Sequence, residues 1–125
     1  MSIEQNKELV MRFLNEFMIG QDIKVLDELL GPSYKQHNPG LGHGKASLIK
    51  FFQDFWAIHP KPGYFLKRII AENDLVAIHY QFKPDQEEEG YAIVDIFRIE
   101  NDRLVEHWDV CQEMPADSLN DSPMF

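Results

Sequence analysis

The chain has little of several features that define common protein classes. A single cysteine, Cys111, excludes a framework of intrachain disulfides. Basic residues are outnumbered, with 12 Lys and Arg against 21 Asp and Glu, and the formal net charge is −9. The absence of a basic stripe argues against nucleic acid and anionic membrane as partners. No apolar run is long enough to cross a bilayer and no cationic leader is evident, so we expect a cytoplasmic protein.

Motifs for metals, phosphates and covalent nucleophiles are also missing. The sequence has no paired-histidine helix motif and no cysteine knuckle, which excludes the common zinc patterns. The glycine-rich loop at residues 38–44 lacks the lysine and serine that end a phosphate-binding loop. No serine is placed on a strand-to-helix elbow, and Cys111 has no cationic neighbour. We therefore expect no metal and no cofactor.

The 125 residues, 44% of them hydrophobic, fit a single domain, and the apolar pattern changes halfway along the chain. Helical spacing runs from the Ser2 cap to Gly20, from the Asp22 cap to Gly31 and from Lys45 to His59. Strand-like segments follow at 64–71, 75–83, 90–100 and 103–113. This order predicts an α+β fold, a curved antiparallel sheet wrapped around three N-terminal helices. Residues 1–115 form the expected domain and residues 116–125 an extended tail.

One carboxylate, Asp95, interrupts the apolar run from Tyr91 to Ile99. A carboxylic acid surrounded by apolar side chains resists ionisation and is able to exchange protons with a weak carbon acid near neutral pH. A structural role, with the carboxylate held by backbone donors, is the alternative. Asp95 is the leading catalytic candidate.

The neighbours of Asp95 depend on strand register. A two-residue turn at Asn101 and Asp102 places Glu100 opposite Arg103, and counting outward places Asp95 opposite Trp108. In this register His107 and Asp109 face away from Asp95, together with Arg98. A one-residue bulge would reverse this assignment.

Two further histidines are candidates for catalysis. His79 lies beside Asp95 in one of two registers of the preceding hairpin and faces away in the other. His37 follows the second helix next to the Pro-Gly loop, a position suited to a cavity mouth. The residues expected to bind substrate are Tyr34, Gln36, Phe52, Trp56, Phe97 and Trp108. The five aromatic side chains among them favour a small apolar ligand.

The chain resembles the SnoaL-like polyketide cyclases of the nuclear transport factor 2-like superfamily. The segments that carry the resemblance are Tyr34 to Pro39, Gly44-Lys45, Val94 to Arg98, Asn101-Asp102 and Leu104 to Val110. The resemblance implies a cone-shaped α+β barrel, a homodimer formed through the outer sheet face, and a cofactor-free acid/base site. It implies an aldol condensation that closes a ring, with Asp95 as acid/base and His79 and His37 nearby.

Two other functions use the same fold. An isomerase of the ketosteroid isomerase type, or a dehydratase, would use the same base without forming a carbon–carbon bond. A dimeric module that binds a small molecule without catalysis is the third hypothesis, because fold alone does not decide function.

Overall fold

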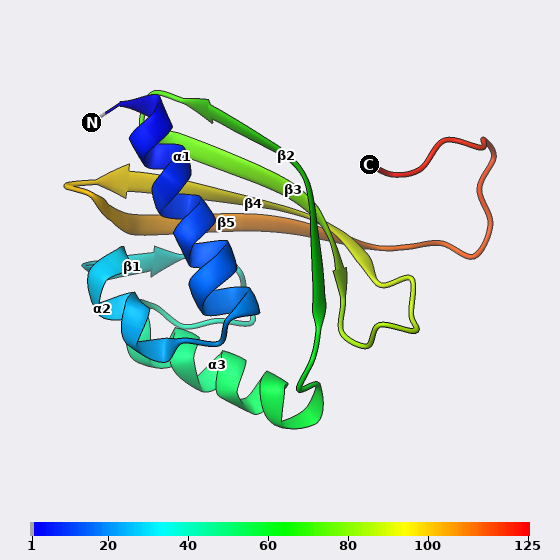
Figure 1. The fold of residues 1–125 in the computed structure, drawn as a ribbon, viewed down its shortest axis with the longest axis horizontal. Helices are drawn as coiled ribbons and strands as arrows, with labels where there is room; N and C mark the ends of the chain where they lie inside the picture. The colour runs from blue at the N-terminus through cyan, green and yellow to red at the C-terminus, as the bar shows by residue number, and fades with distance from the viewer. Residues whose placement is uncertain (1) are drawn as a thin grey trace.

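The computed structural model describes residues 2–125, and within them three helices lie against a five-stranded sheet (Figure 1). In chain order the elements are α1 (Ile3–Arg12), the π-helix η1 (Phe13–Ile19) that continues it, the 3₁₀ turn η2 (Ile23–Val25), α2 (Leu26–Leu29), β1 (Leu30–Gln36), α3 (Gly44–Ile58), β2 (Gly63–Glu72), β3 (Leu75–Lys83), β4 (Tyr91–Glu100) and β5 (Arg103–Glu113). None of the helices in this part of the chain is long and apolar enough to span a membrane.

The first helix begins and ends where the sequence predicts. Ser2 and Gln5 form a capping box, in which the Ser2 side chain accepts from the Gln5 backbone N–H and the Gln5 side chain accepts from Ser2. The helix ends at Gly20, where a Cβ atom would lie 2.7 Å from the carbonyl oxygen of Glu16. Local signals of this kind are read reliably from sequence because all the partners lie within one helical turn.

The sheet has the strand order β1-β5-β4-β3-β2. Strands β2 to β5 form the predicted antiparallel meander, but β1 pairs with β5 in parallel, so the sheet is mixed and not fully antiparallel. The sheet curves without closing, and the helices lie on its concave side (Figure 1). The predicted α+β class is confirmed.

A β-bulge corrects the predicted register between β4 and β5. The turn at Asn101 and Asp102 is as expected, with φ values of 51° and 60° and with Glu100 opposite Arg103. Two residues later the register shifts, because Val105 is an additional residue on β5. Asp95 therefore lies opposite Asp109, and the predicted pairing with Trp108 is wrong.

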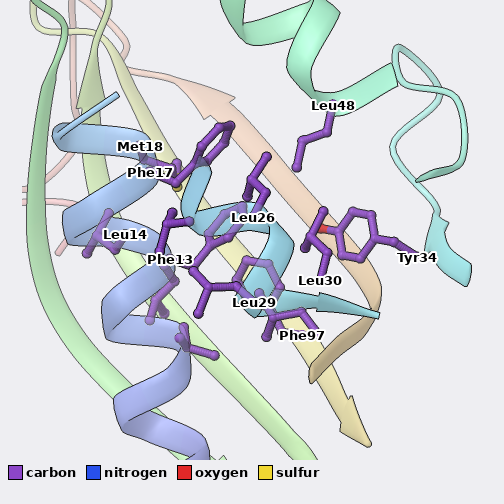
Figure 2. Packing of buried hydrophobic residues seen from close by; sticks show 14 of the residues in the cluster. Phe13, Leu14, Phe17, Met18, Leu26, Leu29, Leu30, Tyr34, Leu48 and Phe97 are labelled. Carbon is purple, nitrogen blue, oxygen red and sulfur yellow. The ribbon is translucent and has the colours of Figure 1, made fainter. Parts of the chain in front are cut away.

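The core lies between the first helix, α2, α3 and the concave face of the sheet. In Figure 2 the side chains of Phe13 and Phe17 gather with those of Leu26 and Leu29. The Phe17 ring contacts Trp56 of α3 edge-on, with the centroids 5.6 Å apart. These aromatic contacts fix α3 at the open end of the sheet, where a cavity forms beneath it.

Residues 114–125 contain no helix or strand. The Phe125 ring lies against the outer sheet face, 5.5 Å from the His79 ring and 5.1 Å from the Lys67 ammonium nitrogen. The tail thus returns to the sheet on the face opposite the core.

Candidate active site

A cavity of about 170 Å³ lies between α3 and the concave face of the sheet. Most of its wall is apolar or aromatic. The lining residues are Phe13, Met18, Tyr34, Asn38, Leu41, Leu48, Phe51, Phe52, Phe55, Tyr64, Tyr80, Phe82, Ile93, Asp95, His107, Asp109 and Cys111. Such a wall with a few convergent polar groups is typical of a small-molecule site.

The polar part of the wall is centred on Asp95 and His107. The two side chains come from the paired strands β4 and β5, and their residues are only 4% and 6% exposed. His107 Nε2 lies 2.9 Å from Asp95 Oδ1. The Tyr80 hydroxyl of β3 donates to the other Asp95 oxygen, Oδ2, over 2.5 Å. Asp95 is therefore held by two buried partners.

Gln36, at the end of β1, fixes the proton on the far side of the His107 ring. Its Oε1 accepts from the backbone N–H groups of His37 and Asn38, both at 3.2 Å, which identifies this atom as the amide oxygen. The same oxygen lies 2.7 Å from His107 Nδ1. Because the oxygen only accepts, Nδ1 must carry a proton.

This arrangement leaves one proton between His107 Nε2 and Asp95 Oδ1. With Nδ1 protonated, the pair is either an imidazolium beside a carboxylate or a neutral imidazole that accepts from a carboxylic acid. Asp109 Oδ2 lies 3.9 Å from Nε2 and accepts from Asn38 Nδ2 at 2.8 Å. The site therefore holds a carboxyl group and an imidazole that share a proton, next to a second carboxylate.

The tyrosines around this pair remain neutral donors. Burial, followed by the charge of Asp95, raises the pKa of Tyr80 well above its usual value. The same two causes, in the same order, raise the pKa of Tyr34 well above its usual value. A phenol that keeps its proton remains a donor to Asp95 Oδ2 throughout the physiological pH range.

The three residues also have the donor atoms of a cation site. One donor atom from each of Asp95, His107 and Asp109 lies within 4.8 Å of the others. Two carboxylates and a histidine suit several divalent metals. Gln36 holds Nδ1 in the way that outer partners hold a metal-bound histidine. The sequence patterns indicated no metal, and the register error concealed this cluster.

Two of the predicted substrate-binding residues, Tyr34 and Phe52, line the cavity. Gln36 lies behind His107 and bonds its ring, while the Phe97 ring packs 4.9 Å from that of His107. Trp56 belongs to the hydrophobic core. These three residues support the wall and are not among those that line it.

The other predicted residues lie on the outer face. His79 pairs with Val94, and its side chain is placed beside Arg68 and Phe125, so it does not reach Asp95. Burial, then the charges of Arg68 and Lys67, lowers the pKa of His79. Of the two registers that the sequence left possible, the structure has the one in which His79 faces away from Asp95.

His37 and Trp108 form a stack on the outer face. Their ring centroids are 4.8 Å apart with an interplanar angle of 6°, and His37 Nε2 lies 2.6 Å from Glu106. Trp108 was expected beside Asp95, but the bulge at Val105 turns it outward. His37 reaches the site only through its backbone, which donates to Gln36.

Sequence reasoning missed His107, Asp109, Tyr80 and Tyr64 as wall residues. The alternative register with a bulge would have found the first two. For Tyr80 the signal was the alternation of Val76, Ile78 and Tyr80 on one face of β3, with Ile78 opposite Asp95.

Three helices against a curved mixed sheet, with a buried acid/base pair in an apolar cavity, define a member of the nuclear transport factor 2-like superfamily. The SnoaL-like domain family matches residues 10–107, and the chain belongs to this family. None of the curated proteins matches the sequence.

Solved structures share the fold at low identity. A proposed polyketide cyclase from Acidithiobacillus ferrooxidans is 19% identical, with a TM-score of 0.72 over 89% of this chain and 91% of that one. IdmH, a proposed polyketide cyclase from Streptomyces antibioticus, is 21% identical, with a TM-score of 0.71 over 86% and 91%. AclR from Streptomyces galilaeus, a proposed hydroxylase, is 20% identical, with a TM-score of 0.70 over 91% and 83%. These similarities establish the fold, and different reactions are named for it.

Proposed function

We propose that the protein is a cofactor-independent acid/base enzyme that acts on a small, neutral, apolar carbonyl compound. The observation that carries this proposal is the buried His107–Asp95 pair, joined over 2.9 Å, in the wall of an apolar cavity. The leading reaction is an aldol condensation that closes a ring, and two solved structures of similar fold are named as proposed polyketide cyclases.

In this reaction Asp95 removes a proton from the carbon next to a carbonyl group, and the resulting enolate carbon attacks a second carbonyl within the same molecule. The new alkoxide takes a proton back from the His107–Asp95 pair, so protons and electrons balance. Positioned proton transfer contributes about 10²- to 10⁴-fold in rate. Tyr80 and Gln36 hold the two reacting side chains in place.

The charge of the site favours a neutral substrate. Asp95 and Asp109 both line the cavity, and among residues 2–125 His107 is the only basic residue in its wall. The chain as a whole carries a formal charge of −9, so an anionic compound is repelled both at a distance and in the cavity. An uncharged ketone or 1,3-dicarbonyl compound meets no such repulsion.

The test is exchange of the α-proton with deuterium in heavy water, followed by NMR for a panel of cyclic and open-chain 1,3-dicarbonyl compounds. Asp95→Asn is expected to lose at least 10²-fold in exchange while remaining folded. Asp117→Asn, in the tail, is the matched control and is expected to exchange as the wild type does. Unchanged exchange in a folded Asp95→Asn protein would refute the proposed base.

The released products then separate the alternatives. A cyclised product indicates the aldol reaction, whereas a shifted double bond indicates an isomerase and loss of water a dehydratase. Binding without exchange across the whole panel indicates a module that binds a ligand without catalysis.

A second candidate function, metal-dependent catalysis, is favoured by the donor atoms of Asp95, His107 and Asp109 within 4.8 Å of one another. Calorimetry with Zn²⁺ and Mn²⁺ tests it on the purified protein. Loss of binding in His107→Gln, but not in His43→Gln, would support this candidate over the metal-free reaction.

We also propose that two copies pair through the outer sheet face. An apolar row crosses four strands there, formed by Ile70, Ala77, Ile96 and Trp108, which are successive partners in the sheet. Ile70 is 61% exposed and Val110, on the same face, is 67% exposed. Analytical ultracentrifugation is expected to give a dimer for the wild type and a monomer for the double variant Ile70→Glu, Val110→Glu.

A further inference from the structure

The Tyr64 hydroxyl is a buried polar group with no hydrogen-bond partner in residues 2–125. Tyr64 lies on β2, at the end of the sheet where the cavity forms, opposite Phe82 of β3. Buried hydroxyl groups in folded proteins nearly always have a partner, because losing water without replacing its hydrogen bonds is costly. An unpaired hydroxyl in a cavity wall is therefore a position at which a ligand atom would compensate this cost.

The hydroxyl belongs to the same wall as the acid/base pair. The Tyr64 ring lies 6.1 Å from that of Tyr80, whose hydroxyl is bonded to Asp95. Burial, and after it the charge of Asp95, raises the pKa of Tyr64 above its usual value. Tyr64 is therefore a neutral donor, and an oxygen atom that accepts from it lies in the same cavity as the proton-transfer groups.

The size of the cavity limits what this oxygen is attached to. An engineered apolar cavity of about 150 Å³ in another protein holds one benzene molecule. The cavity here measures about 170 Å³. Three phenylalanines of α3, Phe51, Phe52 and Phe55, form part of its wall and suit the faces and edges of a single ring.

We propose that the cavity binds a carbonyl compound of single-ring size and that the Tyr64 hydroxyl donates a hydrogen bond to its oxygen. This inference rests on the proposed function for the identity of the oxygen as a carbonyl. In that reaction the hydroxyl also meets the negative charge that develops on the oxygen when the α-proton leaves.

The first experiment measures binding, which does not require turnover. Acetophenone has one ring and one carbonyl oxygen, and isopropylbenzene has nearly the same shape without the oxygen. NMR titration of the wild type and Tyr64→Phe is expected to show acetophenone binding weakened about 2- to 12-fold by the substitution, the range for one neutral hydrogen bond. Isopropylbenzene is expected to bind both proteins equally.

The matched control is Tyr91→Phe, which removes a hydroxyl from a tyrosine that is not part of the cavity wall. It is expected to leave the affinity for both probes unchanged. Equal loss of affinity for both probes in Tyr64→Phe would mean that the ring only packs, and would overturn the assignment. Unchanged binding of acetophenone would overturn it as well.

Two further measurements test the remaining parts of the inference. Tyr64→Phe removes an unpaired buried hydroxyl, so its Tm without ligand is expected to equal or exceed that of the wild type. A lower Tm would mean that the hydroxyl already has a partner, against the inference. Anthrone, a ketone with three fused rings, is expected not to bind, and an affinity equal to that of acetophenone would overturn the size limit.

These outcomes are independent of the acid/base proposal. If Asp95→Asn leaves deuterium exchange unchanged but Tyr64→Phe still separates the two probes, the hydroxyl recognises a ligand in a cavity with a different function. If exchange depends on Asp95 and the probes are not separated, the enzyme proposal stands and the role of Tyr64 is rejected.

Discussion

Replacing Gln36 with leucine tests whether this residue determines the protonation of His107. The leucine has a similar volume but no acceptor. His37 keeps a partner for its backbone N–H, because that group also donates to the His107 carbonyl oxygen at 3.0 Å. The backbone N–H of Asn38, in a half-buried residue, also loses the acceptor that Gln36 provides. The buried group that loses its acceptor is the Nδ1–H of His107.

The size of the effect follows from the burial of that group. His107 is 6% exposed, so water does not readily replace the amide oxygen. A buried donor left without an acceptor costs about 1 to 3 kcal/mol. For a domain of this length that cost lowers Tm by roughly 3 to 15 °C. Gln36→Glu retains an acceptor oxygen at the same reach and is expected to keep the proton on Nδ1.

The assay that separates a positioning role from a merely structural one is long-range ¹H–¹⁵N NMR of the histidine rings. The chain has five histidines, and His107→Gln identifies the signals of the fifth. The wild type and Gln36→Glu are expected to show a protonated Nδ1 at His107. Gln36→Leu is expected to lose this pattern and, with it, at least 10-fold in α-proton exchange.

An unchanged Nδ1–H signal in folded Gln36→Leu would refute the reasoning, because the proton would then be fixed by something other than the amide oxygen. If Gln36→Leu loses stability but its NMR pattern does not change, the role of Gln36 is only structural.

Three further predictions concern titrating groups. Hydrogen bonds from His37 and then from Arg98 lower the pKa of Glu106 in the folded protein. The ionised Glu106 therefore stabilises the fold fully above the pKa of an unfolded-state glutamate, about 4.3. This stabilisation is lost as the pH falls below that value and through the lower folded-state pKa. Urea unfolding between pH 5 and 3 is therefore expected to show a steeper loss for the wild type than for Glu106→Gln, and equal slopes would contradict this. Burial raises the pKa of Tyr80 well above its usual value, so its phenol is expected to ionise only when the protein unfolds. An alkaline titration followed by absorbance measures this, and the difference between the wild type and Tyr80→Phe gives the signal of Tyr80. Burial also raises the pKa of the Cys111 thiol in the cavity wall, which slows its alkylation by a maleimide because the thiolate is the reactive form. Bound acetophenone is expected to slow this alkylation further. An unchanged rate would mean that acetophenone binds elsewhere.

The parts of the fold that the sequence predicted correctly depend on short-range signals. The cap at Ser2, the stop at Gly20 and the turn at Asn101 and Asp102 each involve residues within a few positions of one another. Periodicity likewise separated helices from strands. The parallel pairing of β1 with β5 joins residues about seventy positions apart in the sequence, and no local sequence pattern predicts it.

The candidate site was only partly predictable for the same reason. Asp95 stood out because a carboxylate in an apolar strand is unusual, and it lies in the cavity wall. His107 was assigned to the wrong face because register was counted from the turn without a bulge. Gln36 was predicted to touch substrate, whereas it contacts the histidine, a relation that requires the parallel pairing to be known.

Val105 determines which chemistry the cavity contains. It is accommodated because β1 has Gly31 beside it, where a Cβ atom would come within 2.9 Å of Val105 Cγ1. If Val105 paired with Arg98 instead of bulging, every later residue of β5 would move to the opposite face, bringing an indole inward and sending the imidazole to solvent. A larger side chain at Gly31 would push against the same valine. The identity of the reactive wall is thus set by the bulge at Val105, which decides the face on which every later side chain of β5 lies.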